Sequence, residues 1–160
     1  MDPARPSTRP VLTAPLRRLL AVLLAVFGLM AIDSLYLSTV TVTEAVTGKT
    51  YQNVFYLTLF LTHLALGLLL IVPALLFGAL HLRRAWSRPN RYAVRAGVGL
   101  YLSLIALLAS GVLLTRFGFF EVNHPLTRTL AYWVHVASPL AVAWLFVVHR
   151  LAGPRLRWRA

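Results

Sequence analysis

Residues 132–150 read YWVHVASPLAVAWLFVVHR, an apolar run of membrane-spanning length that carries two histidines. Residues 62–84, THLALGLLLIVPALLFGALHLRR, show the same feature earlier in the chain. A helix needs roughly 20 apolar residues to cross the hydrocarbon core of a bilayer, and an imidazole placed there loses its hydration and must find a partner. The two stretches therefore predict membrane helices, and their histidines are the first candidates for a functional site.

The composition of the whole chain agrees with a membrane protein. Of its 160 residues, 59% are hydrophobic and 12% are charged, and the mean hydropathy is +0.73. These values exclude an ordinary soluble domain. The sequence contains no cysteine, so iron–sulfur clusters, thiolate metal sites and covalently attached haem are excluded on this chain. Any redox centre must be held by histidine or methionine.

Four membrane-spanning helices are expected. Their predicted ranges are 19–39, 54–82, 93–115 and 129–149. Residues 1–18 are expected to form a basic, proline-rich flexible arm and residues 151–160 a basic tail, on either side of a membrane domain over 19–150. Residues 40–53 are rich in β-branched and polar side chains and predict a loop or a short extended segment. The predicted fold class is all-α, an integral membrane four-helix bundle of up-down-up-down order.

Basic residues are distributed unequally between the two ends of this bundle. The N-terminal arm carries four arginines, the loop after the second span five and the C-terminal end four, against one lysine and two arginines in the other two loops. The positive-inside rule then places both termini in the cytoplasm. The first apolar run lacks a cleavage site, so we expect it to be retained. The expected location is a bacterial-type inner (plasma) membrane, crossed several times.

The histidines of the second and fourth spans match in depth and in face. Because these spans run in the same direction, His63 is expected level with His135 near the outer side. His81 is expected level with His149 near the inner side. At roughly 100° per residue, both gaps return to nearly the same helix face. The gaps of 18 and 14 residues differ in rise, roughly 27 Å against roughly 21 Å. Tilt of the second span, a kink at Pro73 and tilted haem planes could absorb the difference.

Facing imidazoles at two levels predict two bis-histidine haem sites. Such sites hold low-spin haem iron for electron transfer and leave no open coordination position. Because the chain has no cysteine, the haems would be non-covalent b-type haems. The predicted iron ligands are His63 with His135 and His81 with His149.

Glycines and arginines lie where a porphyrin would need them. Small residues let the macrocycle approach the helix backbone, and guanidinium groups neutralise propionates. The expected glycine contacts are Gly67, Gly78, Gly97 and Gly111. The expected propionate partners at the inner haem are Arg83, Arg84 and Arg150.

With these residues the chain resembles the dihaem cytochrome b family of respiratory and photosynthetic membrane complexes. In that family, the second and fourth helices of a four-helix core each carry two histidines, at a spacing like that of His135 and His149. The chain departs from the pattern in its longer gap from His63 to His81 and in having only Gly28 on the first helix. The resemblance implies electron transfer across the bilayer between the quinone pool and a partner redox subunit. That partner would be a c-type cytochrome, an iron–sulfur protein or a dehydrogenase subunit.

Polar residues near the expected outer side are candidates for a quinone or proton site. They are Asp33, Glu121, Asn123 and His124. If quinol is oxidised near the outer haem, groups of this kind would take up its protons. A solvated position at the interface is the alternative for Asp33, and a surface position is the alternative for His124.

Two other functions are compatible with the sequence. In a haem-free structural or lipid-binding subunit, the histidines would hydrogen-bond between helices. In a small proton-coupled carrier, Asp33 and the histidines would move protons, but the chain lacks an inverted repeat and has few acids. No catalytic residue is recognised, so the expected role is an electron-transfer subunit of an oxidoreductase complex rather than a self-contained enzyme. Its expected partners are membrane lipids and redox subunits, not nucleic acid.

Overall fold

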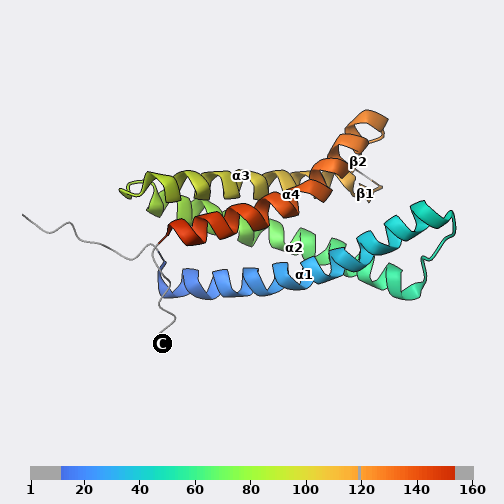
Figure 1. Cartoon of the computed structure of the whole chain (residues 1–160), viewed down its shortest axis with the longest axis horizontal. Helices are drawn as coiled ribbons and strands as arrows, with labels where there is room; N and C mark the ends of the chain where they lie inside the picture. Colours follow the sequence, from blue (N-terminus) through green and yellow to red (C-terminus); the bar gives the residue numbers. More distant parts are fainter. Residues whose placement is uncertain (1–11, 119, 154–160) are drawn as a thin grey trace, which may run out of the picture.

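The computed structural model describes residues 12–118 and 120–153, and in that part of the chain four long helices are joined by short connections (Figure 1). They are α1 (Ala14–Thr47), α2 (Val54–Ala85), α3 (Arg91–Leu114) and α4 (Pro125–Ala152). Each is long and apolar enough to cross a membrane. The all-α membrane bundle predicted from the sequence is confirmed. The distal parts of the expected N-terminal arm and C-terminal tail, 1–11 and 154–160, lie outside the described residues.

Successive helices run in opposite directions, so α1 begins and α4 ends at the same end of the bundle (Figure 1). We call this the arginine end; it includes residues 86–90 between α2 and α3. The opposite end, with residues 48–53 and 115–124, is the hairpin end. α4 packs mainly on α3 and α1 mainly on α2. The two helices that carry the paired histidines, α2 and α4, are not among the closely packed pairs.

Apolar side chains cover the outside of the bundle. A small buried cluster is formed by Leu23 of α1 with Leu70 and Ala74 of α2. Elsewhere large apolar residues such as Leu69 of α2 and Leu140 of α4 are exposed. A soluble monomer rarely exposes such extensive apolar surface, whereas lipid tails would cover it in a bilayer. The arrangement indicates a multi-pass membrane protein in contact with lipid.

α1 is longer than the sequence predicted, and the expectation of a loop or extended segment at residues 40–47 is wrong. The helix continues to Thr47, and Gly48 ends it in the left-handed conformation with φ of 65°. The hydroxyls of Thr39 and Thr43 donate to backbone carbonyls one turn earlier in the helix. These bonds satisfy the threonine side chains inside a helix, so their preference for extended structure does not decide the conformation.

The beginning of α1 also differs from the expectation of a flexible arm up to residue 18. The helix starts at Ala14, and Pro15 lies in its first turn. Proline is tolerated there because the first backbone N–H groups of a helix have no partner within the helix. The basic residues Arg17 and Arg18 therefore belong to α1 and are exposed at the arginine end.

Short polar contacts organise the hairpin end. Strands β1 (Arg116–Phe117) and β2 (Phe120–Glu121) form an antiparallel pair, and Arg116 Nε lies 3.4 Å from Glu121 Oε1. On the other connection, Glu44 Oε1 accepts a 2.8 Å hydrogen bond from the backbone N–H of Tyr51. This bond ties the end of α1 to the segment that leads into α2.

Candidate functional site

The histidines of α2 and α4 meet in two pairs, the same pairs that their depths in the sequence predicted. Toward the hairpin end, the ring centroids of His63 and His135 are 6.1 Å apart and the ring planes cross at 83°. Toward the arginine end, the centroids of His81 and His149 are 6.0 Å apart and the planes cross at 82°. We call these the hairpin-end pair and the arginine-end pair. Each joins two helices that otherwise pack little against each other.

The unequal spacing of the histidines does not prevent this match. The two α2 histidines are 18 residues apart and the two α4 histidines 14, yet the ring separations in the two pairs are almost equal. Pro73 lies between the histidines of α2, and Pro139 lies between those of α4. Proline removes one helical hydrogen bond and allows a bend, and the first turns of α4 lean away from the rest of that helix (Figure 1).

Backbone carbonyls of α3 hold both imidazoles of α4. His149 Nδ1 lies 3.0 Å from the carbonyl oxygen of Ala93. His135 Nδ1 lies 3.2 Å from the carbonyl oxygen of Leu107. A carbonyl oxygen only accepts hydrogen bonds, so in each neutral ring Nδ1 carries the hydrogen and Nε2 keeps its lone pair. No hydrogen bond within the described part of the chain uses Nε2 of either ring.

Glycines of α3 make room for these two rings. A Cβ on Gly97 would lie 3.1 Å from Cε1 of His149, and one on Gly111 would lie 3.0 Å from Cε1 of His135. Each glycine stands four residues after the carbonyl that the histidine contacts. The sequence placed both glycines beside a porphyrin, and the structure places them against the imidazoles. The 14-residue spacing shared by the two glycines and the two histidines of α4 was the signal for this contact.

The two histidines of α2 have different surroundings. His63 Nδ1 lies 3.2 Å from Asp33 Oδ2 and 3.5 Å from Ser34 Oγ, both on α1. The ring of His81 stacks on Phe77, with centroids 5.5 Å apart and planes at 9°. His81 Nδ1 is buried and has no hydrogen-bond partner among the described residues. One histidine of α2 therefore has a carboxylate beside it, and the other has an aromatic ring.

The glycines of α2 have neighbours that the sequence did not predict. A Cβ on Gly78 would overlap the ring of Tyr101 from α3, whose hydroxyl donates a 3.0 Å hydrogen bond to the carbonyl of Leu75. A Cβ on Gly67 would lie 3.6 Å from Cε of Met30, an ordinary contact. The packing of α2 against α3 thus accounts for Gly78, and nothing in the sequence singled out Tyr101 as its partner.

The three arginines expected beside the inner haem lie at the arginine end. Arg83 and Arg84 are exposed, and Arg150 follows His149 and is partly buried. Arg84 Nη1 donates a 3.2 Å hydrogen bond to Thr13 Oγ1 at the start of α1. The three side chains add to the positive charge at this end of the bundle.

The four polar candidates for a quinone or proton site do not form one cluster. Asp33 lies beside the hairpin-end pair. Glu121 is ion-paired within the β1–β2 hairpin, and Asn123 and His124 are exposed. Within the described residues, no hydrogen bond or ion pair joins these three to Asp33.

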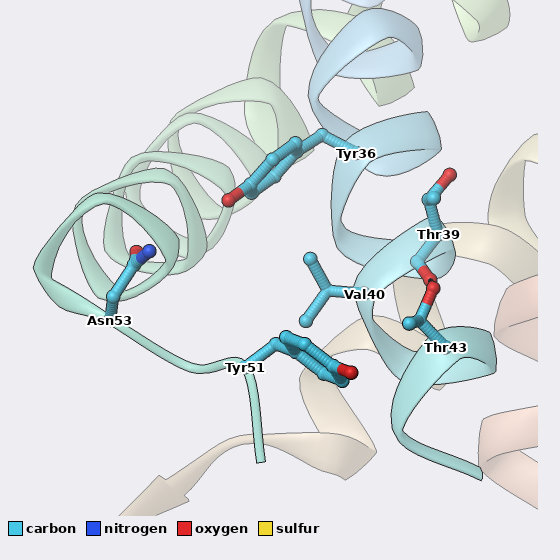
Figure 2. Close-up of a pocket in the computed structure, with 6 residues that line it drawn as sticks. All are labelled: Tyr36, Thr39, Val40, Thr43, Tyr51 and Asn53. Atoms are coloured by element: carbon cyan, nitrogen blue, oxygen red, sulfur yellow. Dashed lines mark hydrogen bonds between the residues drawn. The ribbon is translucent and has the colours of Figure 1, made fainter. Parts of the chain in front are cut away.

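A small open pocket lies between α1 and the beginning of α2 at the hairpin end (Figure 2). Its volume is about 280 Å³. Its lining combines aromatic rings, hydroxyls and one amide, from Tyr36, Thr39, Val40, Thr43, Tyr51 and Asn53. Tyr36 follows Asp33 by three residues on α1, so the lining residue nearest to that carboxylate in sequence is about one helical turn from it.

Comparisons with known proteins do not assign this chain to a family. No protein-family model, curated protein or solved structure matches it. Among the described residues, no group of three or more histidine, cysteine, aspartate or glutamate side chains is arranged to hold a metal ion. The two histidine pairs are thus the features of the described chain that point most directly to a function.

Proposed function

We propose that this chain is a membrane b-type cytochrome that binds two haems, one between His63 and His135 and one between His81 and His149. The supporting observation is the ring separation in both pairs. A histidine nitrogen binds a first-row metal ion at roughly 2 Å, so two imidazoles on opposite sides of one ion have centroids about 6 Å apart. The centroid distances of 6.1 and 6.0 Å agree with this value.

The donor set suits haem better than a bare metal ion. Each pair offers two imidazole nitrogens, and a porphyrin supplies the other ligands of the iron. At His63, His135 and His149, an acceptor lies beside Nδ1. Metal-binding histidines commonly donate their second ring N–H in this way, which orients the ring and leaves the other nitrogen for the metal.

Bound haem would supply reversible one-electron exchange at its iron. The contribution of the protein is to hold the imidazoles in pairs at two levels of the bundle. Because one pair lies toward each end of a membrane-spanning bundle, electrons would pass between the two faces of the membrane.

We infer further that the chain exchanges electrons with the quinone pool and with a partner redox subunit. By the positive-inside rule, the arginine end would face the cytoplasm of a bacterial-type cell, with both termini on that side. The described arginines at this end are Arg17, Arg18, Arg83, Arg84, Arg88, Arg91, Arg95 and Arg150. The pocket at the hairpin end offers hydroxyl groups and aromatic surface to a quinone head group (Figure 2).

Haem analysis of the purified protein tests the proposal. The full-length chain, produced in haem-sufficient cells, is expected to show a b-type reduced-minus-oxidised spectrum. The pyridine haemochrome assay is expected to give two haems per chain. Pure, folded protein without haem would overturn the proposal and favour a haem-free structural or lipid-binding subunit.

A further inference from the structure

Asp33 is the acidic side chain that contacts the paired histidines within the described part of the chain. Its Oδ2 lies 3.2 Å from His63 Nδ1, and the side chains of Asp33 and His63 are only 11% and 23% exposed. Asp33 Oδ1 is buried and has no hydrogen-bond partner among the described residues. A carboxylate inside a membrane bundle is costly unless it is paired, so its position beside an imidazole requires an explanation.

Within the described residues, the other three paired histidines have no charged acceptor at Nδ1. His135 and His149 contact neutral backbone carbonyls, and His81 Nδ1 has no partner in the described structure. The hairpin-end pair therefore has an acidic group in contact with one of its rings. No acidic group from 12–118 or 120–153 contacts the arginine-end pair.

We propose that Asp33 is a positioning residue for His63, an inference that rests on the haem-binding function proposed above. By accepting the Nδ1 hydrogen, the carboxylate leaves Nε2 of His63 as the ligand atom. A carboxylate hydrogen-bonded to a ligating imidazole also makes that imidazole a stronger donor. Both the stronger donor and the nearby negative charge favour ferric over ferrous iron, so Asp33 lowers the reduction potential of the hairpin-end haem.

The experiment is a redox titration of purified full-length protein, monitored by haem absorbance. It compares the wild type with the D33N variant. Asparagine keeps the size of the side chain and a carbonyl acceptor but removes the charge. D33N is expected to retain two haems, to shift the potential of the hairpin-end haem upward and to leave the other potential unchanged. The H149A variant is expected to retain only the hairpin-end haem. A potential shift seen when D33N is added to H149A therefore belongs to that haem.

E44Q is the matched control. It makes the same change from carboxylate to amide on the same helix, at a partly exposed residue whose contacts are with the connection to α2. We expect E44Q to leave both potentials unchanged. D33E keeps the negative charge, so the hairpin-end haem of this variant is expected to have a potential close to that of the wild type.

The possible results separate this inference from the haem-binding proposal. Wild-type protein without haem contradicts the haem-binding proposal itself. An unchanged hairpin-end potential in haem-loaded D33N, or equal shifts of both haems, overturns the role of Asp33 alone. If D33N loses the hairpin-end haem, recovery in D33E supports the role and no recovery overturns it. If D33N does not fold, the smaller uncharged variant D33S serves in its place, with the same upward shift expected.

Discussion

The imidazole of His149 lies against Gly97, so closely that a Cβ on the glycine would lie 3.1 Å from Cε1 of the ring. The same ring has its Nδ1 3.0 Å from the carbonyl oxygen of Ala93, one helical turn before the glycine. The missing side chain lets the imidazole approach the backbone of α3. The position of a proposed iron ligand therefore depends on a residue that has no side chain.

Replacing Gly97 by alanine is expected to displace the His149 ring and to reduce occupancy of the arginine-end haem. Overpacking of this kind typically costs about 1–3 kcal/mol, which outweighs the roughly 1 kcal/mol that alanine gains in helix propensity. Haem-to-protein stoichiometry measures the effect. G99A is the control, because a Cβ there would make only ordinary contacts of 3.6 and 3.7 Å with Leu145. Equal haem content in G97A, G99A and wild type would contradict the argument.

Removing one histidine should remove one haem. H135A is expected to lose the hairpin-end haem and H149A the arginine-end haem, so each variant would retain about half of the wild-type haem, because each pair is a separate site. H124A changes an exposed histidine outside both pairs and should retain both haems. Pyridine haemochrome analysis of the folded variants gives the count. Full haem content in H135A would show that His135 is not a ligand.

Electron paramagnetic resonance can test the orientation of the proposed ligands. The ring planes cross at 83° in the hairpin-end pair and at 82° in the arginine-end pair. Nearly perpendicular imidazoles leave two iron d orbitals close in energy, so both oxidised haems should give strongly anisotropic low-spin signals. Signals typical of parallel imidazole planes would contradict the geometry of both pairs.

Tyr101 should contribute to the stability of the packing between α2 and α3. Y101F removes the 3.0 Å hydrogen bond to the carbonyl of Leu75. It should lower the free energy of unfolding by about 0.5–1.5 kcal/mol. Y101A also empties the space beside Gly78 and should lower the free energy of unfolding by about 3–5 kcal/mol. Thermal unfolding in detergent ranks the variants by their stability. Y92F, on the same helix at a residue that is 66% exposed, should match the wild type. A Y101F variant as stable as Y92F would show that the hydrogen bond contributes nothing.

Some of the fold could be predicted from the sequence because it depends on local composition. The apolar spans follow from the match between helix length and bilayer thickness, and the end of α4 near Gly153 follows from residue types. The extension of α1 to Thr47 could not be predicted from β-branched propensity. In the structure, the hydroxyl of Thr47 donates to a carbonyl within the helix and Glu44 contacts the connection to α2, and residue propensities contain neither contact.

The sequence by itself determined which residues lie on one helix face and at what depth, because a helix has a regular rise and rotation per residue. Together with the common direction of the second and fourth spans, that regularity was sufficient to predict that His63 pairs with His135. Only the tertiary structure decided that Asp33 lies beside His63 and that a carbonyl of α3 lies beside His135. The physical reason is that side-chain packing sets the rotation and tilt of each helix relative to its neighbours, and the periodicity of one helix contains no information about the next.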